Sequence, residues 1–123
     1  MRKFAAFAGA VLVLLTVSGC EPKISPIAEQ DIKDVAVYTH EVSRPLTEDE
    51  ISEFVRLYNS ASYGGKKTGE GGTPDFWLCF TLTSSDETVV LNDFYGKIEP
   101  YNADRYIESK ELYELIKRLS ETI

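Results

Sequence analysis

The stretch from residue 76 to residue 83 constrains the fold more than any other part of the chain. Its sequence, FWLCFTLT, alternates between two faces, as residues do along a β-strand. The first face carries Phe76, Leu78, Phe80 and Leu82, and the second carries Trp77, Cys79, Thr81 and Thr83. An apolar sheet face has to be buried against another layer. We therefore predict that this strand is the centre of a sheet whose apolar face is covered by helices.

Other segments predict strands that complete a small antiparallel sheet. Residues 32–39 (IKDVAVYT) alternate in the same way, and residues 88–95 (TVVLNDFY) follow the central strand after a short polar turn, as in a hairpin. Residues 97–101 are a candidate third short strand in this region. Residues 105–108 either extend the sheet or only lead into the next element. We expect three to four strands in all.

Two helices are predicted by capping residues and apolar stripes. Thr47 and Glu50 have the spacing of a capping box, and Ser109 is placed to cap a second helix near the C-terminus. The stripes are Ile51, Phe54, Val55 and Tyr58 in the first helix, and Leu112, Leu115, Ile116 and Leu119 in the second. Residues 62–74, with five glycines, predict a flexible loop. The expected fold class is α+β, with both helices packed on one face of the sheet in a single domain, residues 32–123.

The N-terminus has the composition of a secretory signal peptide. Arg2 and Lys3 precede an uncharged apolar run over residues 4–15, and small residues lead to Cys20 in the sequence VSGC. The apolar run is shorter than the roughly 20 residues of a spanning helix. The last four residues resemble the lipobox of bacterial lipoproteins, and the alternative is a plain signal peptide with an incidental cysteine. The resemblance implies that residues 1–19 are removed and that Cys20 carries lipid.

Residues 20–31 then predict a lipidated cysteine followed by a tether. Pro22 and Pro26 interrupt this segment, which has no helix or strand period, so we expect an extended chain that lets the domain stand off the bilayer. The resemblance places the protein outside the cytoplasm, on the cell membrane or the outer membrane. If Cys20 carries lipid, Cys79 has no partner for an intrachain disulfide, because the chain has two cysteines.

The charge of the chain argues against some partners. The formal net charge is −7, and removal of Arg2 and Lys3 with the signal peptide would make it −7 − 2 = −9. An acidic domain is repelled by phosphate backbones, so we expect no nucleic acid partner. For the same reason we expect contact with the membrane to come from lipid on Cys20 rather than from a basic patch.

The sequence contains no recognisable catalytic constellation. His40 is the one histidine in the chain, and Glu41 is its one close acidic neighbour. Cys79 is expected to be a small core residue rather than a reactive thiol. The lysines of the glycine-rich loop lack the spacing of a phosphate-binding loop. We therefore expect neither an enzyme nor a metal or other cofactor.

The remaining candidates are aromatic residues that suit a binding surface. They are Trp77, on the second face of the central strand, and Tyr95, Tyr101 and Tyr106 toward the C-terminus. The alternative for the tyrosines is that they seal the edge of the core. The sequence thus favours a non-catalytic binding or interaction module of the cell envelope, with a protein or a small ligand as partner. A second hypothesis is an inhibitor or immunity-type protein whose acidic loops block an extracytoplasmic enzyme such as a lysozyme.

Overall fold

The computed structural model describes residues 24–68 and 72–123, so the predicted signal peptide and Cys20 lie outside the described residues. The described chain forms strands, two α-helices and one short 3-10 helix. The strands are β1 (Ile32–Thr39), β2 (Ser43–Pro45), β3 (Tyr63–Lys66), β4 (Phe76–Leu82), β5 (Thr88–Phe94), β6 (Lys97–Pro100) and β7 (Arg105–Ile107). The helices are η1 (Glu29–Asp31), α1 (Glu48–Ser60) and α2 (Lys110–Ser120).

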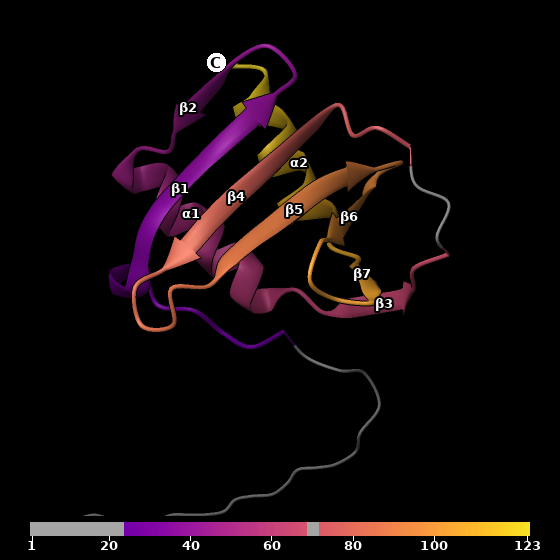
Figure 1. The fold of residues 1–123 in the computed structure, drawn as a ribbon, viewed down its shortest axis with the longest axis horizontal. Helices are drawn as coiled ribbons and strands as arrows, with labels where there is room; N and C mark the ends of the chain where they lie inside the picture. The colour runs from indigo at the N-terminus through magenta and orange to yellow at the C-terminus, as the bar shows by residue number, and fades with distance from the viewer. Residues whose placement is uncertain (1–23, 69–71) are drawn as a thin grey trace, which may run out of the picture.

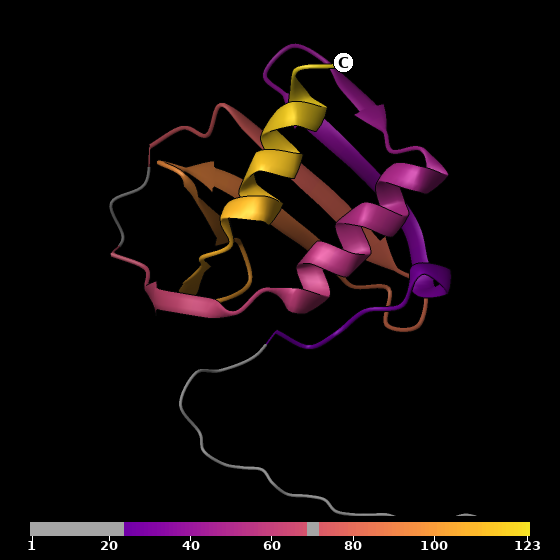
Figure 2. The ribbon, with the colours of Figure 1, turned by 180° about the vertical axis from the view of Figure 1, so that it is seen from behind.

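The strands form one antiparallel sheet, and both α-helices lie on the same face of it. The strand order is β2-β1-β4-β5-β6-β7-β3, and every pair of neighbours is antiparallel. Figure 1 shows the sheet from its uncovered side, and Figure 2 shows α1 and α2 crossing the opposite side. The predicted α+β class, with the helices on one face, is therefore confirmed.

The predicted number of strands is wrong, because the described residues form seven strands rather than three to four. The unpredicted strands β2 and β3 have three and four residues, and β7, left open by the sequence, has three. Strands this short show little alternation, and β3 carries two glycines within the segment predicted as a flexible loop. Their pairing with neighbouring strands, such as Tyr63 of β3 opposite Ile107 of β7, makes them strands.

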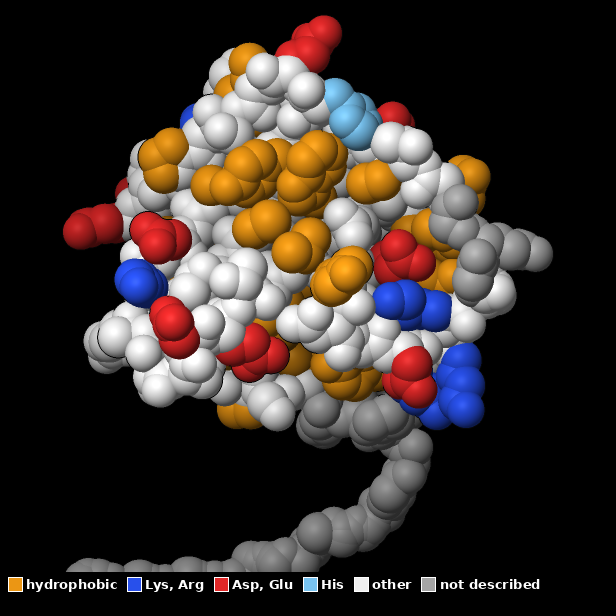
Figure 3. All heavy atoms as spheres, viewed as in Figure 1, with side chains coloured by type: hydrophobic (Ala, Val, Ile, Leu, Met, Phe, Trp, Pro, Cys, Tyr) orange, Lys and Arg blue, Asp and Glu red, His pale blue; other side chains and the backbone are white. Residues whose placement is uncertain are grey.

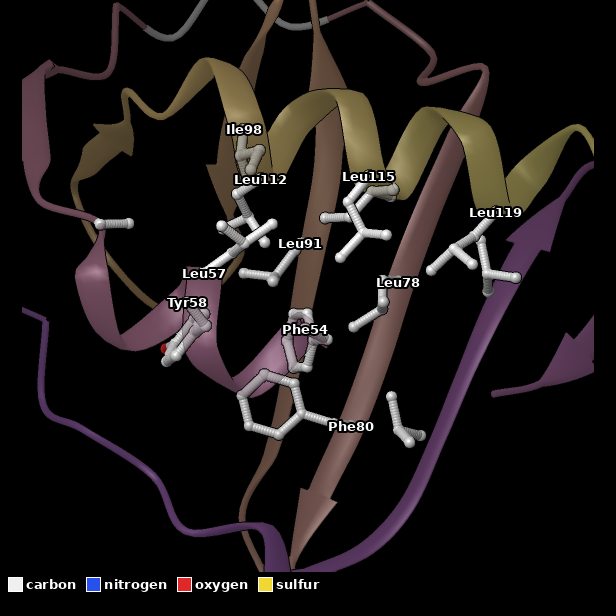
Figure 4. Close-up of a cluster of buried hydrophobic side chains, with 14 of the residues drawn as sticks. Phe54, Leu57, Tyr58, Leu78, Phe80, Leu91, Ile98, Leu112, Leu115 and Leu119 are labelled. Carbon is white, nitrogen blue, oxygen red and sulfur yellow. The ribbon is translucent and has the colours of Figure 1, made fainter. Parts of the chain in front are cut away.

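The core lies between the sheet and the two helices, with β4 near its centre. The ring of Phe80 meets the rings of Phe54 and Tyr58 from α1 edge-on, each at 5.5 Å between centroids. Helix α2 packs on β1, β4 and β6 with the apolar stripe predicted for it (Figure 4). Its buried residues are Leu112, Leu115, Ile116 and Leu119. The prediction that the Phe80 face of β4 is buried under helices is confirmed.

Helix α1 begins at a capping box that the nearby cation of Arg44 reinforces. The Thr47 hydroxyl accepts a hydrogen bond from the Glu50 amide, and the Glu50 carboxylate accepts one from the Thr47 amide at 2.8 Å. Arg44 of β2 donates to both Glu50 oxygens at 2.8 and 3.0 Å, and a second hydrogen of its Nη2 reaches the Thr122 hydroxyl. This arrangement ties the edge of the sheet, the start of α1 and the C-terminal end together.

The segment before β1 is packed on the domain, so the predicted tether is wrong for residues 24–31. Ile24 is buried in the core at 5% exposure, and Ile27 packs against the same cluster. The Asn59 side chain holds the backbone of Ile27 through two hydrogen bonds of 2.9 Å, one to its amide and one from its own amide group to the carbonyl. Two isoleucines that follow no helix or strand period, together with the hydrogen bonds to and from Asn59, thus hold the segment against the domain and the end of α1.

Candidate functional site

The candidate site is the face of the sheet that α1 and α2 leave uncovered. The register places Tyr38 of β1 opposite Trp77 of β4, and Trp77 opposite Asn92 of β5. Side chains directly opposite each other in an antiparallel pair stand on the same face. Figure 3 shows this face, with hydrophobic side chains gathered over β1, β4 and β5 toward the end where His40 lies.

Tyr38 and Trp77 form an aromatic pair on this face. Their rings are parallel within 2°, with centroids 5.9 Å apart, and the His40 ring meets Trp77 edge-on at 5.3 Å. The His40 Nε2 lies 2.6 Å from the Pro74 carbonyl oxygen and donates to it, because a carbonyl can only accept. His40 therefore links the β1–β2 turn to the segment that enters β4, and it holds one side of the Trp77 ring in place.

A hollow of about 650 Å³ lies beside the aromatic pair, where the short strand β2 ends and the edge of β1 is left open. Its lining includes Tyr38, Asp34, Ser43, Cys79 and Thr81. The lining thus combines an aromatic ring with a carboxylate, hydroxyls and a thiol. Mixed apolar and polar walls of this kind are typical of surfaces that orient a ligand by a few hydrogen bonds.

Cys79 lies on this uncovered face and not in the core, contrary to the prediction. Its side chain is half-buried and lines the hollow, because odd-numbered residues of β4 point away from the helices. Burial raises the pKa of the Cys79 thiol. The thiolate is the nucleophilic form of cysteine, so this environment weakens the reactivity of Cys79 at neutral pH.

The three candidate tyrosines do not gather around Trp77. Tyr95, in the β5–β6 turn, is 84% exposed, and its ring meets Phe94. Tyr106 of β7 is only 4% exposed, because its ring stacks on Phe94 and lies under the Lys97 ammonium group. Tyr101, in the β6–β7 turn, is 73% exposed. Trp77 and the exposed tyrosines therefore offer separate surfaces, and Tyr106 offers almost none.

A polar contact joins β5 to α2. The Tyr113 hydroxyl donates to one Asp93 oxygen at 2.5 Å, and the Asp75 amide donates to the other at 3.3 Å. Burial, together with this hydrogen bond and the Asp93 charge, raises the pKa of Tyr113 to about 12. Both Asp93 oxygens are thus engaged within the protein, which makes this contact structural.

The described residues contain no group of three or more histidine, cysteine, aspartate or glutamate side chains that could hold a metal ion. In the same residues, none of the helices has the length and apolar character needed to cross a membrane. Comparison with known proteins gave no match to a protein-family model, to a curated protein or to a solved structure.

Proposed function

We propose that the chain is a lipid-anchored envelope lipoprotein whose domain is a non-catalytic binding module. Its partner, an envelope protein or a small ligand, binds to the uncovered face of the sheet around Trp77. The anchor is lipid on Cys20, and the proposal for it rests on the resemblance of VSGC to a lipobox. The observation that supports the binding surface is the aromatic pair, which stands on a face that neither helix covers, beside a hollow at the edge of β1.

Two properties favour this face as a binding surface: it presents aromatic side chains, and these side chains are held in position before a partner binds. Aromatic side chains at the centre of an interface contribute much of its binding energy, because they bury a large area with little loss of conformational freedom. Tyr38 and Trp77 are already stacked, and His40 restricts Trp77 further. A partner that covers them would therefore bind a surface that is largely ordered beforehand.

Site-specific photo-crosslinking in cells that express the lipidated protein tests the binding face. A photoreactive phenylalanine analogue replaces Tyr38 in one variant and the exposed Glu111 of α2 in a matched control. We expect a discrete crosslinked product from position 38 only, and its loss when Trp77→Ala is added to a chain whose melting temperature stays close to that of the parent. Equal products from both positions, or none from position 38, would contradict the proposal.

The anchor has its own test. Cys20→Ala should abolish labelling with radioactive fatty acid and release the protein from the membrane fraction, whereas Cys79→Ala should leave both unchanged. Fatty acid incorporation that persists in the Cys20→Ala protein would show that the lipid is attached elsewhere or that the anchor is of another kind.

The excess of acidic over basic residues, 20 to 13, favours a second candidate function, which is inhibition of a basic enzyme outside the cytoplasm. Lysozyme activity measured with and without the mature lipoprotein distinguishes this function from a binding module with another partner. Inhibition that weakens with added salt would support it. An unchanged rate of lysis across the range of protein concentrations would count against it.

A further inference from the structure

The packing of residues 24–31 limits how far the domain can lie from a lipid on Cys20. Four Cα–Cα steps join Cys20 to Ile24, and steps of about 3.8 Å allow at most about 15 Å between the two Cα atoms. Ile24 is buried in the core, and Asn59 holds the backbone of Ile27. The folded domain therefore begins within about 15 Å of the proposed lipid, rather than at the end of a long tether.

The residues around this entry point form one end of the domain, which we call the attachment end. It comprises residues 24–27 and the β6–β7 turn, residues 101–104. Ser25, Pro26 and Ile27 line the same hollow of about 250 Å³ as Asn102 and Ala103. Figures 1 and 2 both show the loop between β6 and β7 in the half of the domain where the coloured chain begins.

We propose that the attachment end rests on the bilayer surface, with the Tyr101 ring in the headgroup region. This inference rests on the proposed lipid at Cys20. Tyrosine favours the membrane–water interface, because its ring is apolar and its hydroxyl remains hydrated. Tyr101 is 73% exposed, and its chain neighbours Pro100 and Asn102 line the same hollow as residues 25–27, so bilayer contact at this end would remove much of its ring from water.

The β6–β7 turn holds Tyr101 in a fixed position. The Tyr101 amide donates to the Val90 carbonyl at 2.8 Å. The Lys67 ammonium group donates to the carbonyls of Pro100 and Ala103 at 2.9 and 2.8 Å, and the Asn102 side chain donates to the Thr88 carbonyl. The exposed ring is therefore presented by an ordered turn, so little conformational entropy is lost when it meets a surface.

The charges at this end do not favour an anionic bilayer. Glu87 lines the same hollow as residues 25–27, and Asp104 lies in the turn itself. Lys67 is engaged with the turn carbonyls, and Arg105 lines a second hollow with Ala103 and Asp104. These two cations offset the two carboxylates, so the turn has no excess of positive charge to attract anionic headgroups. Contact should therefore occur on zwitterionic lipid without anionic lipid.

Contact of the attachment end with the bilayer also determines where the aromatic pair lies relative to the membrane. Strand β1 starts near the attachment end and runs toward the β1–β2 turn (Figure 1). Its eight residues span roughly 23 Å at about 3.3 Å per step. Trp77 pairs with Tyr38 near the far end of β1, so the proposed binding face is turned sideways and away from the bilayer.

Fluorescence quenching by brominated lipid tests the orientation. Trp77→Phe leaves a chain without tryptophan, into which Tyr101→Trp is introduced. In a matched control, the exposed Val42 of the β1–β2 turn is replaced instead, as Val42→Trp. Each lipidated protein is purified from membranes and reconstituted into phosphatidylcholine vesicles with and without bromine on the acyl chains. Mass spectrometry of the same samples reads the acylation of Cys20, and circular dichroism reads the fold.

We expect bromine to remove about half of the fluorescence at position 101 and little at position 42, because only an interfacial ring lies near the acyl chains. A Gly-Ser insertion of about ten residues after Lys23 should reduce quenching at position 101 without loss of acylation, because it releases the domain from the surface. Equal or absent quenching in acylated protein would overturn the orientation and leave the anchor intact. A Cys20 without acyl groups would overturn the anchor and the orientation together.

Discussion

Replacement of Glu50 by glutamine should make the domain less stable at neutral pH and remove a specific part of its acid sensitivity. The Glu50 carboxylate accepts two hydrogen bonds from Arg44 and one from the Thr47 amide. Glutamine keeps one acceptor oxygen for the cap, so the substitution removes mainly the charge and the second bond to Arg44. The Arg44 guanidinium would then stay partly buried against a neutral group.

The size of the expected loss in the free energy of unfolding follows from the pKa of Glu50. The hydrogen bonds from Arg44, supported by the Thr47 amide and the Arg44 charge, lower the pKa of Glu50 from 4.5 to about 2. At about 1.4 kcal/mol for each pKa unit, a shift of this size corresponds to roughly 3 kcal/mol. The two side chains are 25% and 23% exposed, so solvent screening reduces the effect, and we expect about 1–2 kcal/mol at pH 7.

The direction of the pH dependence follows from the sign of the shift. A carboxylate whose pKa is lower in the folded state stabilises the fold above its unfolded pKa and loses this contribution as protons bind to the folded state. The contribution of Glu50 should therefore be complete above about pH 5, fall steadily below pH 4.5 and be nearly gone at about pH 2. Glu50→Gln has no such group, so the two proteins should converge in stability over this range.

Urea denaturation of the wild-type and Glu50→Gln proteins, measured from pH 7 to pH 2, gives the two free energies of unfolding. Glu53→Gln is the matched control on the same helix, because Glu53 makes one 3.2 Å bond to Arg118 between exposed side chains. We expect the control to change stability by less than about 0.5 kcal/mol at every pH. A difference between wild type and Glu50→Gln that stays constant from pH 7 to pH 2 would refute the assignment of the shift to the folded pair.

Two further substitutions test the core and the packed N-terminal segment. Phe80→Ala should lower the free energy of unfolding by about 3–5 kcal/mol, since it opens a cavity beside Phe54 and Tyr58; an unchanged melting temperature would contradict the central position of β4. Asn59→Ala should cost about 1–2 kcal/mol and speed hydrogen exchange at the Ile27 amide, because two hydrogen bonds are lost. Exchange at Ile27 as slow as in the wild type would show that apolar packing alone holds the segment.

The layers of the fold could be predicted from the sequence because they depend on local periodicity. The alternation in residues 76–83 and the stripes of the two helices identify which side chains are buried, whatever the strand order. The capping box at Thr47 is equally local. Its stabilising partner Arg44 could not be predicted, because the contact depends on how β2 folds back along β1.

The binding face could be predicted only in part, for the same physical reason. The alternation of β4 shows that Trp77 points away from the helices. That Tyr38 stands opposite Trp77 depends on the register between β1 and β4, which one sequence does not specify without a short turn between the strands. The packing of residues 24–27 could not be predicted, because Ile24 and Ile27 lie among prolines with no period, and irregular segments bury apolar side chains without leaving a pattern.

The order of elements itself separates the attachment end from the aromatic pair. The packed segment leads directly into β1, so the first residues of β1 lie near the anchor and its last residues lie far from it. Because β4 is antiparallel to β1, its first residues lie beside the last residues of β1, and Trp77 comes to stand opposite Tyr38. A longer linker after Lys23 would therefore free Tyr101 from the bilayer but leave the aromatic pair unchanged. Partner binding that survives the insertion, with Tyr101 released, would locate recognition on the sheet face and not on the membrane contact.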